Sequence, residues 1–352
     1  MKFEVTRFFR YVFNRNSVAI LLVFLLSGST IARADAVSEL AGFSVFDKVD
    51  LAELAKSDVK TVHGPPMGGR FLSVQSCYVM PGSPAQQVEA LLRWDPTKHR
   101  ELKVFLHSDL PAAPSAANFS KLEKAPDNGA VRALVNATQK LSSDLQISRD
   151  EAKKFSAASG SDGGGAMPAS IAAIWTDVLV DRAKSFVSGG TSVQPPYDHS
   201  GETIRASEEL NGLLKQQEKI RRQFSGFLGE TGIGRGTGSL TPELYWELLE
   251  VEDTGVLTLG AFYSRAGTGG TYQVGDVLYY ASGGYYVALT LYQMWPVNVD
   301  GKASTLLWRG DMISAASLAS LHGVERLGSE SAMMKDISKA ITMFRRDTTG
   351  SR

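Results

Sequence analysis

Residues 272–295 read YQVGDVLYYASGGYYVALTLYQMW and contain the pattern that decides the fold. Two runs rich in Tyr, Val and Leu flank Gly283-Gly284, a pair typical of a tight turn between antiparallel strands. In the second run, from Tyr285 to Trp295, both alternating phases are mostly apolar or aromatic, so neither face reads as a wet surface. A strand covered by protein on one side and lining a cavity on the other would show this pattern. A sheet enclosed between two helical layers would show it too.

Three more runs of the same composition surround this hairpin, at residues 245–252, 256–264 and 304–313. The joints between the runs are short and consist of turn residues, at Asp253-Thr254-Gly255, Gly267 to Gly270 and Asp300-Gly301. Short joints connect antiparallel neighbours, so this part of the chain predicts a five-stranded meander. A helix is expected after it, over residues 331–346, because Met334, Ile337, Ile341 and Phe344 fall on one stripe.

The chain before the meander predicts a strand, a helix and a second strand. Residues 71–80 read as the first strand, and Ser83 with Pro84 gives a strong helix start, since Ser can cap and Pro suits the first helical position. Asp95-Pro96 ends this helix, and a short strand follows over residues 102–107.

Residues 111–240 change to a mainly helical character. Ser148 and Glu151 predict a capping box at one helix, and residues 204–227 predict a longer, highly charged helix. Glycine-rich stretches, including Gly229 to Gly238, read as flexible linkers. The expected organisation is an extension (35–69), the first strands and helix of an α+β domain (70–110), a helical insertion (111–240), and the antiparallel sheet with the C-terminal helix (241–352).

With the insertion set aside, this order of elements resembles the START-related helix-grip fold, also called the polyketide cyclase and lipid-transport superfamily. The segment QVEALLRWDP at residues 87–96 is similar to the first helix of that family and its exit. The resemblance covers residues 70–108 and 241–347, and the long helical insertion departs from the family pattern. It implies an α+β fold in which a curved antiparallel sheet grips the long C-terminal helix.

The first 34 residues have the pattern of a secretory signal peptide. Lys2, Arg7, Arg10 and Arg15 precede an apolar run from residue 18 to 26, and Ala32-Arg33-Ala34 matches a cleavage pattern, with the cut between Ala34 and Asp35. A single membrane anchor is the alternative, but only about ten contiguous residues are strongly apolar where a span needs roughly 20. We therefore expect an exported protein, periplasmic or secreted, with no stable membrane span after cleavage.

The charge and cysteine content of the chain exclude some classes of function. The whole chain of 352 residues has 37 Lys+Arg and 37 Asp+Glu, and removal of residues 1–34 takes away five of the basic and one of the acidic residues. The remainder is mildly acidic with no basic block, which argues against nucleic acid as a partner. Cys77, the single cysteine, lies in an apolar strand-like run and is expected to be a buried, inert thiol.

No motif for catalysis or metal binding is found. No two of the five histidines have the i, i+4 helix spacing of a metalloprotease, and the G-x-S-x-G elbow is missing. The tripeptide Arg309-Gly310-Asp311 lies inside a strand pattern and predicts a bulge with a local ion pair. We therefore predict no catalytic residues, no metal and no cofactor. An enzyme would need a strongly perturbed carboxylate or histidine inside a cleft.

Aromatic and methionine side chains suggest a ligand-binding site, because Tyr and Trp can line an apolar pocket and still offer a donor. The leading hypothesis is a non-enzymatic protein that encloses an apolar or amphipathic, lipid-like small molecule between the sheet and the C-terminal helix, in a cavity of at least about 300 Å³. The candidate residues are Trp246, Tyr263, Tyr280, Tyr286, Tyr292, Trp308, Met333, Met334, Ile337 and Ile341.

A structural or protein-interaction role in the cell envelope is the alternative function. It would use the helical insertion as a surface for a protein partner whose identity the sequence does not indicate. In that case the helix faces around Ile174, Trp175 and Leu214 should be exposed in the isolated chain.

Overall fold

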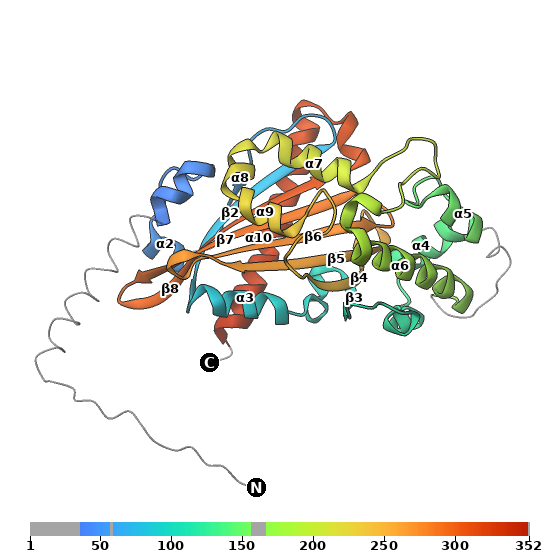
Figure 1. Cartoon of the computed structure of the whole chain (residues 1–352), viewed down its shortest axis with the longest axis horizontal. Helices are drawn as coiled ribbons and strands as arrows, with labels where there is room; N and C mark the ends of the chain where they lie inside the picture. Colours follow the sequence, from blue (N-terminus) through green and yellow to red (C-terminus); the bar gives the residue numbers. More distant parts are fainter. Residues whose placement is uncertain (1–35, 57–58, 156–166, 351–352) are drawn as a thin grey trace, which may run out of the picture.

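The computed structural model of the chain describes residues 36–56, 59–155 and 167–350. The predicted signal peptide and its cleavage site lie outside the described residues. The described part is built around one antiparallel sheet (Figure 1), whose strands are β1 (Lys60–His63), β2 (Phe71–Pro81), β3 (Val104–Leu110), β4 (Glu243–Val251), β5 (Thr254–Ala266), β6 (Tyr272–Ala281), β7 (Val287–Val299) and β8 (Lys302–Ser314).

The strand order is β1-β2-β8-β7-β6-β5-β4-β3, and every neighbouring pair is antiparallel. Strands β4 to β8 are consecutive neighbours, which confirms the predicted meander. The helical insertion joins β3 to β4, which pair with each other at one edge of the sheet. Strand β2 pairs with β8, so the N-terminal part of the fold completes the sheet at the other end.

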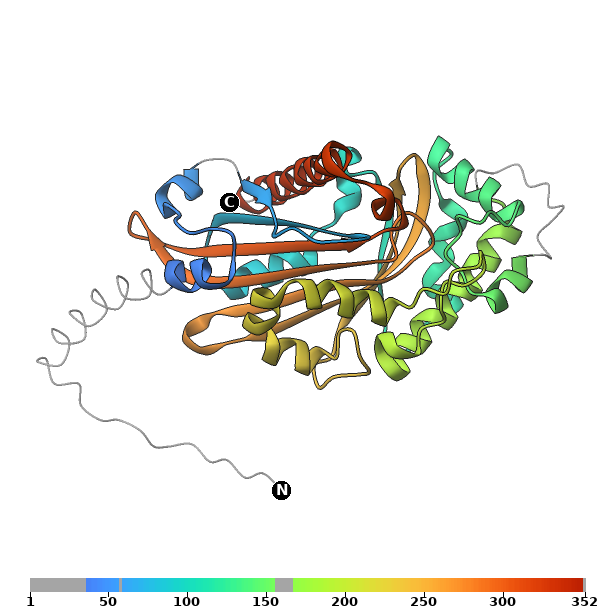
Figure 2. The same ribbon diagram turned by 90° about the horizontal axis from the view of Figure 1, so that it is seen from above.

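Helices cover both faces of this sheet, and Figure 2 shows them on opposite sides. One face packs against α3 (Pro84–Arg93) and α10 (Gly323–Gly350), and the other packs against α2 (Leu51–Lys56) and the insertion. Each face has its own hydrophobic core. The predicted α+β class with a long C-terminal helix on a meander sheet is confirmed, and the two covered faces explain why both phases of residues 285–295 are apolar.

The insertion contains η3 (Ala116–Lys124), α4 (Gly129–Gln139), α5 (Arg149–Phe155), α6 (Ala169–Gly189), η5 (Gly190–Val193), α7 (Ala206–Gln216), α8 (Glu218–Gln223) and α9 (Ser225–Thr231). Helices α4 to α6 gather at one end of the sheet, while α7 to α9 lie across its face (Figure 1). No described helix is both long and apolar enough to cross a membrane.

The two strongest signals for a helix start in the sequence are confirmed. Ser83 caps α3, its hydroxyl accepts a hydrogen bond from the backbone N–H of Gln86, and Pro84 is the first helical residue. At α5 the predicted capping box also forms, because the Ser148 N–H donates to Glu151 Oε2 at 2.6 Å and the Glu151 N–H donates to Ser148 Oγ at 3.2 Å. Both signals depend only on residues three apart, so tertiary packing does not override them.

The prediction of a single helix over residues 204–227 is wrong. The chain forms α7, α8 and α9 instead, with a break at Gln217, whose φ and ψ are −113° and 60°. The Gln217 side chain donates a hydrogen bond to Ser73 Oγ at 3.2 Å, on β2. A long-range contact of this kind interrupts a helix without any local breaker in the sequence.

The ends of the sheet and of the last helix also differ from expectation. The sheet has an eighth described strand, β1, in the segment predicted as an extension. It is only four residues long and none of them is buried, so it lacks the apolar alternation that marks the other strands. Helix α10 starts at Gly323, earlier than the predicted residue 331, in a stretch where Val324 and Leu327 are exposed.

Candidate functional site

A cleft of about 380 Å³ lies between the sheet and the two helices that cover its first face. The helices supply the apolar wall, with Leu91 on α3, Trp94 directly after it, and Ile341 and Phe344 on α10. The Trp94 and Phe344 rings meet edge to face with their centroids 5.8 Å apart, which fixes the relation of α3 to α10 at this wall.

The sheet side of the same cleft carries a row of polar side chains among apolar ones. Asp311 on β8, Thr290 on β7 and Asp276 on β6 are directly opposite one another across three neighbouring strands. The Thr290 hydroxyl donates to Asp311 Oδ1 at 2.9 Å. Buried polar side chains cost free energy unless they are paired, so a polar row beneath a helix signals a constraint other than stability.

Tyr245 on β4 reaches across β5 to this row. Its hydroxyl donates to Asp276 Oδ1 at 2.7 Å. This reach depends on Gly260, the Tyr245 partner on β5, because a Cβ at Gly260 would lie 2.1 Å from the Tyr245 ring. Burial raises the pKa of the Asp276 carboxyl to about 6, although the hydrogen bond from Tyr245 opposes the shift. Asp276 therefore gains or loses a proton close to neutral pH.

Arg309 on β8 supplies the positive charge at the bottom of the cleft. Its Nε donates to Asp311 Oδ2 at 2.8 Å and its Nη2 to Oδ1 at 2.6 Å, while the guanidinium stacks 5.4 Å from the Tyr292 ring centre. Burial alone would lower the pKa of Arg309, but the charge of Asp311 outweighs it and raises the pKa. Among the described residues, none accepts a hydrogen bond from Nη1, so that edge of the guanidinium is left for the cleft.

The predicted local ion pair at residues 309–311 is present, but the predicted bulge is not. Strand β8 pairs without interruption with β2 and with β7 through these residues. Arg309 and Asp311 are two apart, so they project from the same face of a regular strand and can pair without a bulge.

At the β3 edge of the cleft, His107 Nδ1 lies 3.0 Å from Glu247 Oε1 on β4. The His107 ring also lies over Tyr245, with 5.6 Å between the ring centres. Burial lowers the pKa of His107, but the hydrogen bond to Glu247 and its charge outweigh burial and leave the pKa raised. The cleft therefore has two separate carboxylate pairs, one with a histidine and one with an arginine, and Asp276 between them has only a neutral tyrosine as partner.

The sheet divides the ten predicted ligand-binding residues into two groups. Five lie on the face covered by α10, namely Tyr292, Met333, Met334, Ile337 and Ile341. Of these, Tyr292 and Ile341 line the cleft. The other five pack in the core on the opposite face, namely Trp246, Tyr263, Tyr280, Tyr286 and Trp308. A single pocket therefore does not hold all ten, because the strands alternate their side chains and both phases are rich in aromatic residues.

Asp276 and Arg309 are residues of the cleft that the sequence pattern did not predict. Each is a charged residue beside large apolar residues of a strand, which is the signal that could have identified them. For Arg309, the sequence predicts only a local ion pair with Asp311.

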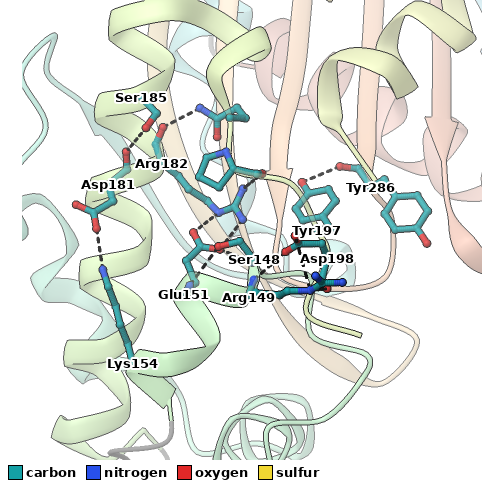
Figure 3. Close-up of polar contacts among 12 residues, drawn as sticks. Ser148, Arg149, Glu151, Lys154, Asp181, Arg182, Ser185, Tyr197, Asp198 and Tyr286 are labelled. Carbon is teal, nitrogen blue, oxygen red and sulfur yellow. Dashed lines mark hydrogen bonds and ion pairs between the residues drawn. The ribbon is translucent and has the colours of Figure 1, made fainter. Parts of the chain in front are cut away.

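A second arginine and carboxylate pair lies in the insertion, where Arg182 and Glu151 face each other (Figure 3) and both side chains are buried. Arg182 on α6 donates from Nε and Nη2 to Glu151, at 2.7 and 2.6 Å, and from Nη1 to the Pro195 carbonyl at 3.0 Å. The guanidinium stacks 4.2 Å from the centre of the Tyr280 ring. Each guanidinium nitrogen of Arg182 has a protein partner, so this pair joins α5, α6 and the sheet and leaves nothing to bind a ligand.

Other candidate chemistry is limited in the described part of the chain. No group of three or more His, Cys, Asp and Glu side chains there is arranged to hold a metal ion. Cys77 is buried, as predicted, and burial raises the pKa of its thiol to about 12, so it stays protonated at neutral pH.

Comparison of the chain with protein-family models, curated proteins and solved structures finds no match. The function is therefore inferred from the residues and geometry of the cleft.

Proposed function

We propose that the chain is an exported protein that binds an amphipathic, lipid-like small molecule in the cleft between the sheet and α10. Export is inferred from the sequence of residues 1–34 and binding from the cleft. The observation that supports binding most strongly is the polar floor of Asp276, Thr290 and Arg309 under an apolar helical wall. A covered sheet face with no ligand to accommodate would be expected to be apolar throughout.

The cleft suits a molecule with two chemically different parts. Its apolar part would lie against Leu91, Ile341 and Phe344, where burial contributes roughly 25 cal/mol per Å² of apolar surface. Its polar end would meet the free Nη1 edge of Arg309 and the Asp276 carboxyl. The volume of about 380 Å³ also exceeds the roughly 300 Å³ at the lower end of ligand pockets.

Native mass spectrometry of the chain purified from its own host, followed by solvent extraction, tests this proposal. We expect a bound amphiphile in a 1:1 ratio. The variant Ala340→Trp places a large ring on the α10 wall of the cleft and should emerge without the ligand. The control is Ala332→Trp, an exposed position on the same helix that should retain it. An unliganded mass for the unmodified chain, unchanged by incubation with total host lipid, would reject the proposal.

A second candidate function is acid–base catalysis in the same cleft, which Asp276 favours. A carboxyl with a pKa of about 6 is suited to exchange protons near neutral pH. If the cleft is catalytic, the bound amphiphile should be converted when it is returned to the purified chain, and Asp276→Asn should stop conversion while binding persists. Recovery of the amphiphile unchanged would leave binding as the function.

The structure gives less support to a protein-interaction role through the helical insertion. Trp175 and Leu214 are buried, and Ile174 packs against the same core. The apolar helix faces on which that hypothesis depends are thus used inside the molecule.

A further inference from the structure

A second pocket, of about 250 Å³, lies on the opposite face of the sheet from the cleft. The sheet contributes Leu244 and Tyr263, helix α6 contributes Phe186 and Val187, and the loop after α9 contributes most of the rest of the wall. We call it the loop pocket. Val187 is 41% exposed, so it marks the side on which the pocket meets solvent.

The loop at residues 232–240 is folded into a definite shape, although its composition predicts a flexible linker. The Arg235 N–H donates to the Gly232 carbonyl at 2.8 Å, and the Leu240 N–H donates to the Glu230 carbonyl at 2.9 Å. Asn211 Nδ2 on α7 and Thr191 Oγ1 on η5 hold the loop from outside through the Gly234 and Arg235 carbonyls. The pocket wall is therefore present before any ligand binds.

Glycine is required at the start of this loop. Gly232 has a φ of +70°, and a Cβ there would lie 2.2 Å from the Gly236 carbonyl oxygen. Only a residue without a side chain lets the two backbone segments approach so closely. The glycines that resemble a linker in the sequence serve to close a compact wall.

Among the described residues that line the loop pocket, Tyr263 alone has an ionisable side chain. The residue as a whole is 5% exposed, and no described residue hydrogen-bonds to its hydroxyl, which is not among the fully buried unpaired groups and is therefore open to water or to a ligand. Burial raises the pKa of the Tyr263 phenol to about 12, so the hydroxyl stays protonated and can donate. A ligand acceptor in the pocket can take the place of water on this donor.

From this geometry we propose that the loop pocket binds a small, uncharged ring compound with one oxygen acceptor, which takes a hydrogen bond from Tyr263. An apolar cavity of about 150 Å³ holds benzene, so about 250 Å³ has room for a ring with a short substituent. A charged ligand would have no counter-ion in this lining. The site lies on the other face of the sheet and shares only Leu244 with the lining of the cleft, and the proposal does not depend on the function proposed there.

Three ligands of nearly equal shape test the proposal: acetophenone, α-methylstyrene, which replaces the carbonyl oxygen with a methylene group, and benzoate, which adds a charge. Binding is measured by titration of the purified chain while the Ile233 methyl signals in the pocket wall are followed by NMR. We expect acetophenone to bind about tenfold more tightly than α-methylstyrene, as one hydrogen bond allows, and benzoate to bind most weakly.

Variants locate the interaction. Tyr263→Phe removes only the hydroxyl and should reduce acetophenone affinity to the level of α-methylstyrene, while Val187→Trp should block both ligands at the mouth. Tyr272→Phe removes a hydroxyl that lines neither pocket and should change nothing. The proposal is overturned if acetophenone leaves the Ile233 signals unmoved at its solubility limit, or if Tyr263→Phe leaves its affinity unchanged.

Discussion

In the described part of the chain, the pairs Arg182 with Glu151 and Arg309 with Asp311 share one design in two different settings. Arg182 with Glu151 and Arg309 with Asp311 each use Nε and Nη2 of the guanidinium, and each guanidinium stacks on a tyrosine. The Arg182 side chain is 1% exposed and its Nη1 donates to a backbone carbonyl. The Arg309 side chain is 19% exposed, and its Nη1 has no partner among the described residues.

The difference shows how the surroundings of an ion pair decide what the pair can do. Where every guanidinium nitrogen donates to a protein acceptor, as in Arg182, the pair fixes the positions of α5, α6 and Pro195. It has no donor left for a ligand. Where one edge is open to a cleft, the same pair can hold a charge in place and offer donors to a ligand. On this view the first pair is structural and the second belongs to the binding site.

The largest effect is expected at the closed pair. Arg182→Met leaves the Glu151 carboxylate buried without its counter-ion and should lower the free energy of unfolding by about 3 to 5 kcal/mol in urea denaturation. Adding Glu151→Gln to Arg182→Met should recover part of this loss, because the uncompensated charge is removed. If Arg182→Met lowers the free energy of unfolding no more than Arg309→Met does, the two pairs do not differ in the way described here.

An intermediate effect, which depends on pH, is expected from Asp276, between the two carboxylate pairs of the cleft. Its pKa is about 6 in the folded chain and about 4 when unfolded, so the folded state binds its proton more tightly. The stability it contributes is present below about pH 4 and is lost as pH rises to about 6, by roughly 2 to 3 kcal/mol at most.

Asp276→Asn should remove this pH dependence while its side-chain oxygen still accepts from Tyr245. The measurement is the unfolding free energy of both proteins from pH 4 to pH 7. The variant should gain stability relative to the unmodified chain as pH rises. A constant difference across this range would show that Asp276 titrates normally.

The smallest stability effect is expected at the open pair. Arg309→Met should cost about 1 to 2 kcal/mol, because Thr290 still donates to Asp311 and because the Arg309 side chain, 19% exposed at the cleft, leaves a space that water can fill. The same variant should lose the bound amphiphile. Native mass spectrometry and urea denaturation of one sample measure both quantities. Full retention of the ligand would remove Arg309 from the binding site.

Much of the fold is predictable from the sequence because local signals agree with the tertiary structure. The joints of the meander, the Ser83 cap and the Ser148 capping box all depend on residues close in sequence. The break at Gln217 and the short strand β1 are not predictable in the same way. The first follows from a hydrogen bond to β2, and the second from pairing with a neighbour rather than from its own composition.

The site is less predictable than the fold for a physical reason. Both faces of the sheet are covered, so both phases of each strand carry apolar and aromatic residues, and residue type does not reveal which phase faces α10. Trp246 and Trp308 were for that reason grouped with Ile341, although the sheet separates them. The charged residues inside the strands, Asp276 and Arg309, carry the information that the aromatic residues lack.

The most direct test of the central claim is NMR of the arginine side-chain N–H groups, with and without the amphiphile extracted from the host protein. The account predicts that the Arg309 Nη1 protons exchange rapidly with water in the free chain and become protected when the ligand binds. The Arg182 signals should be protected in both states. Binding that leaves the Arg309 signals unchanged would contradict the assignment of the open pair to the ligand site.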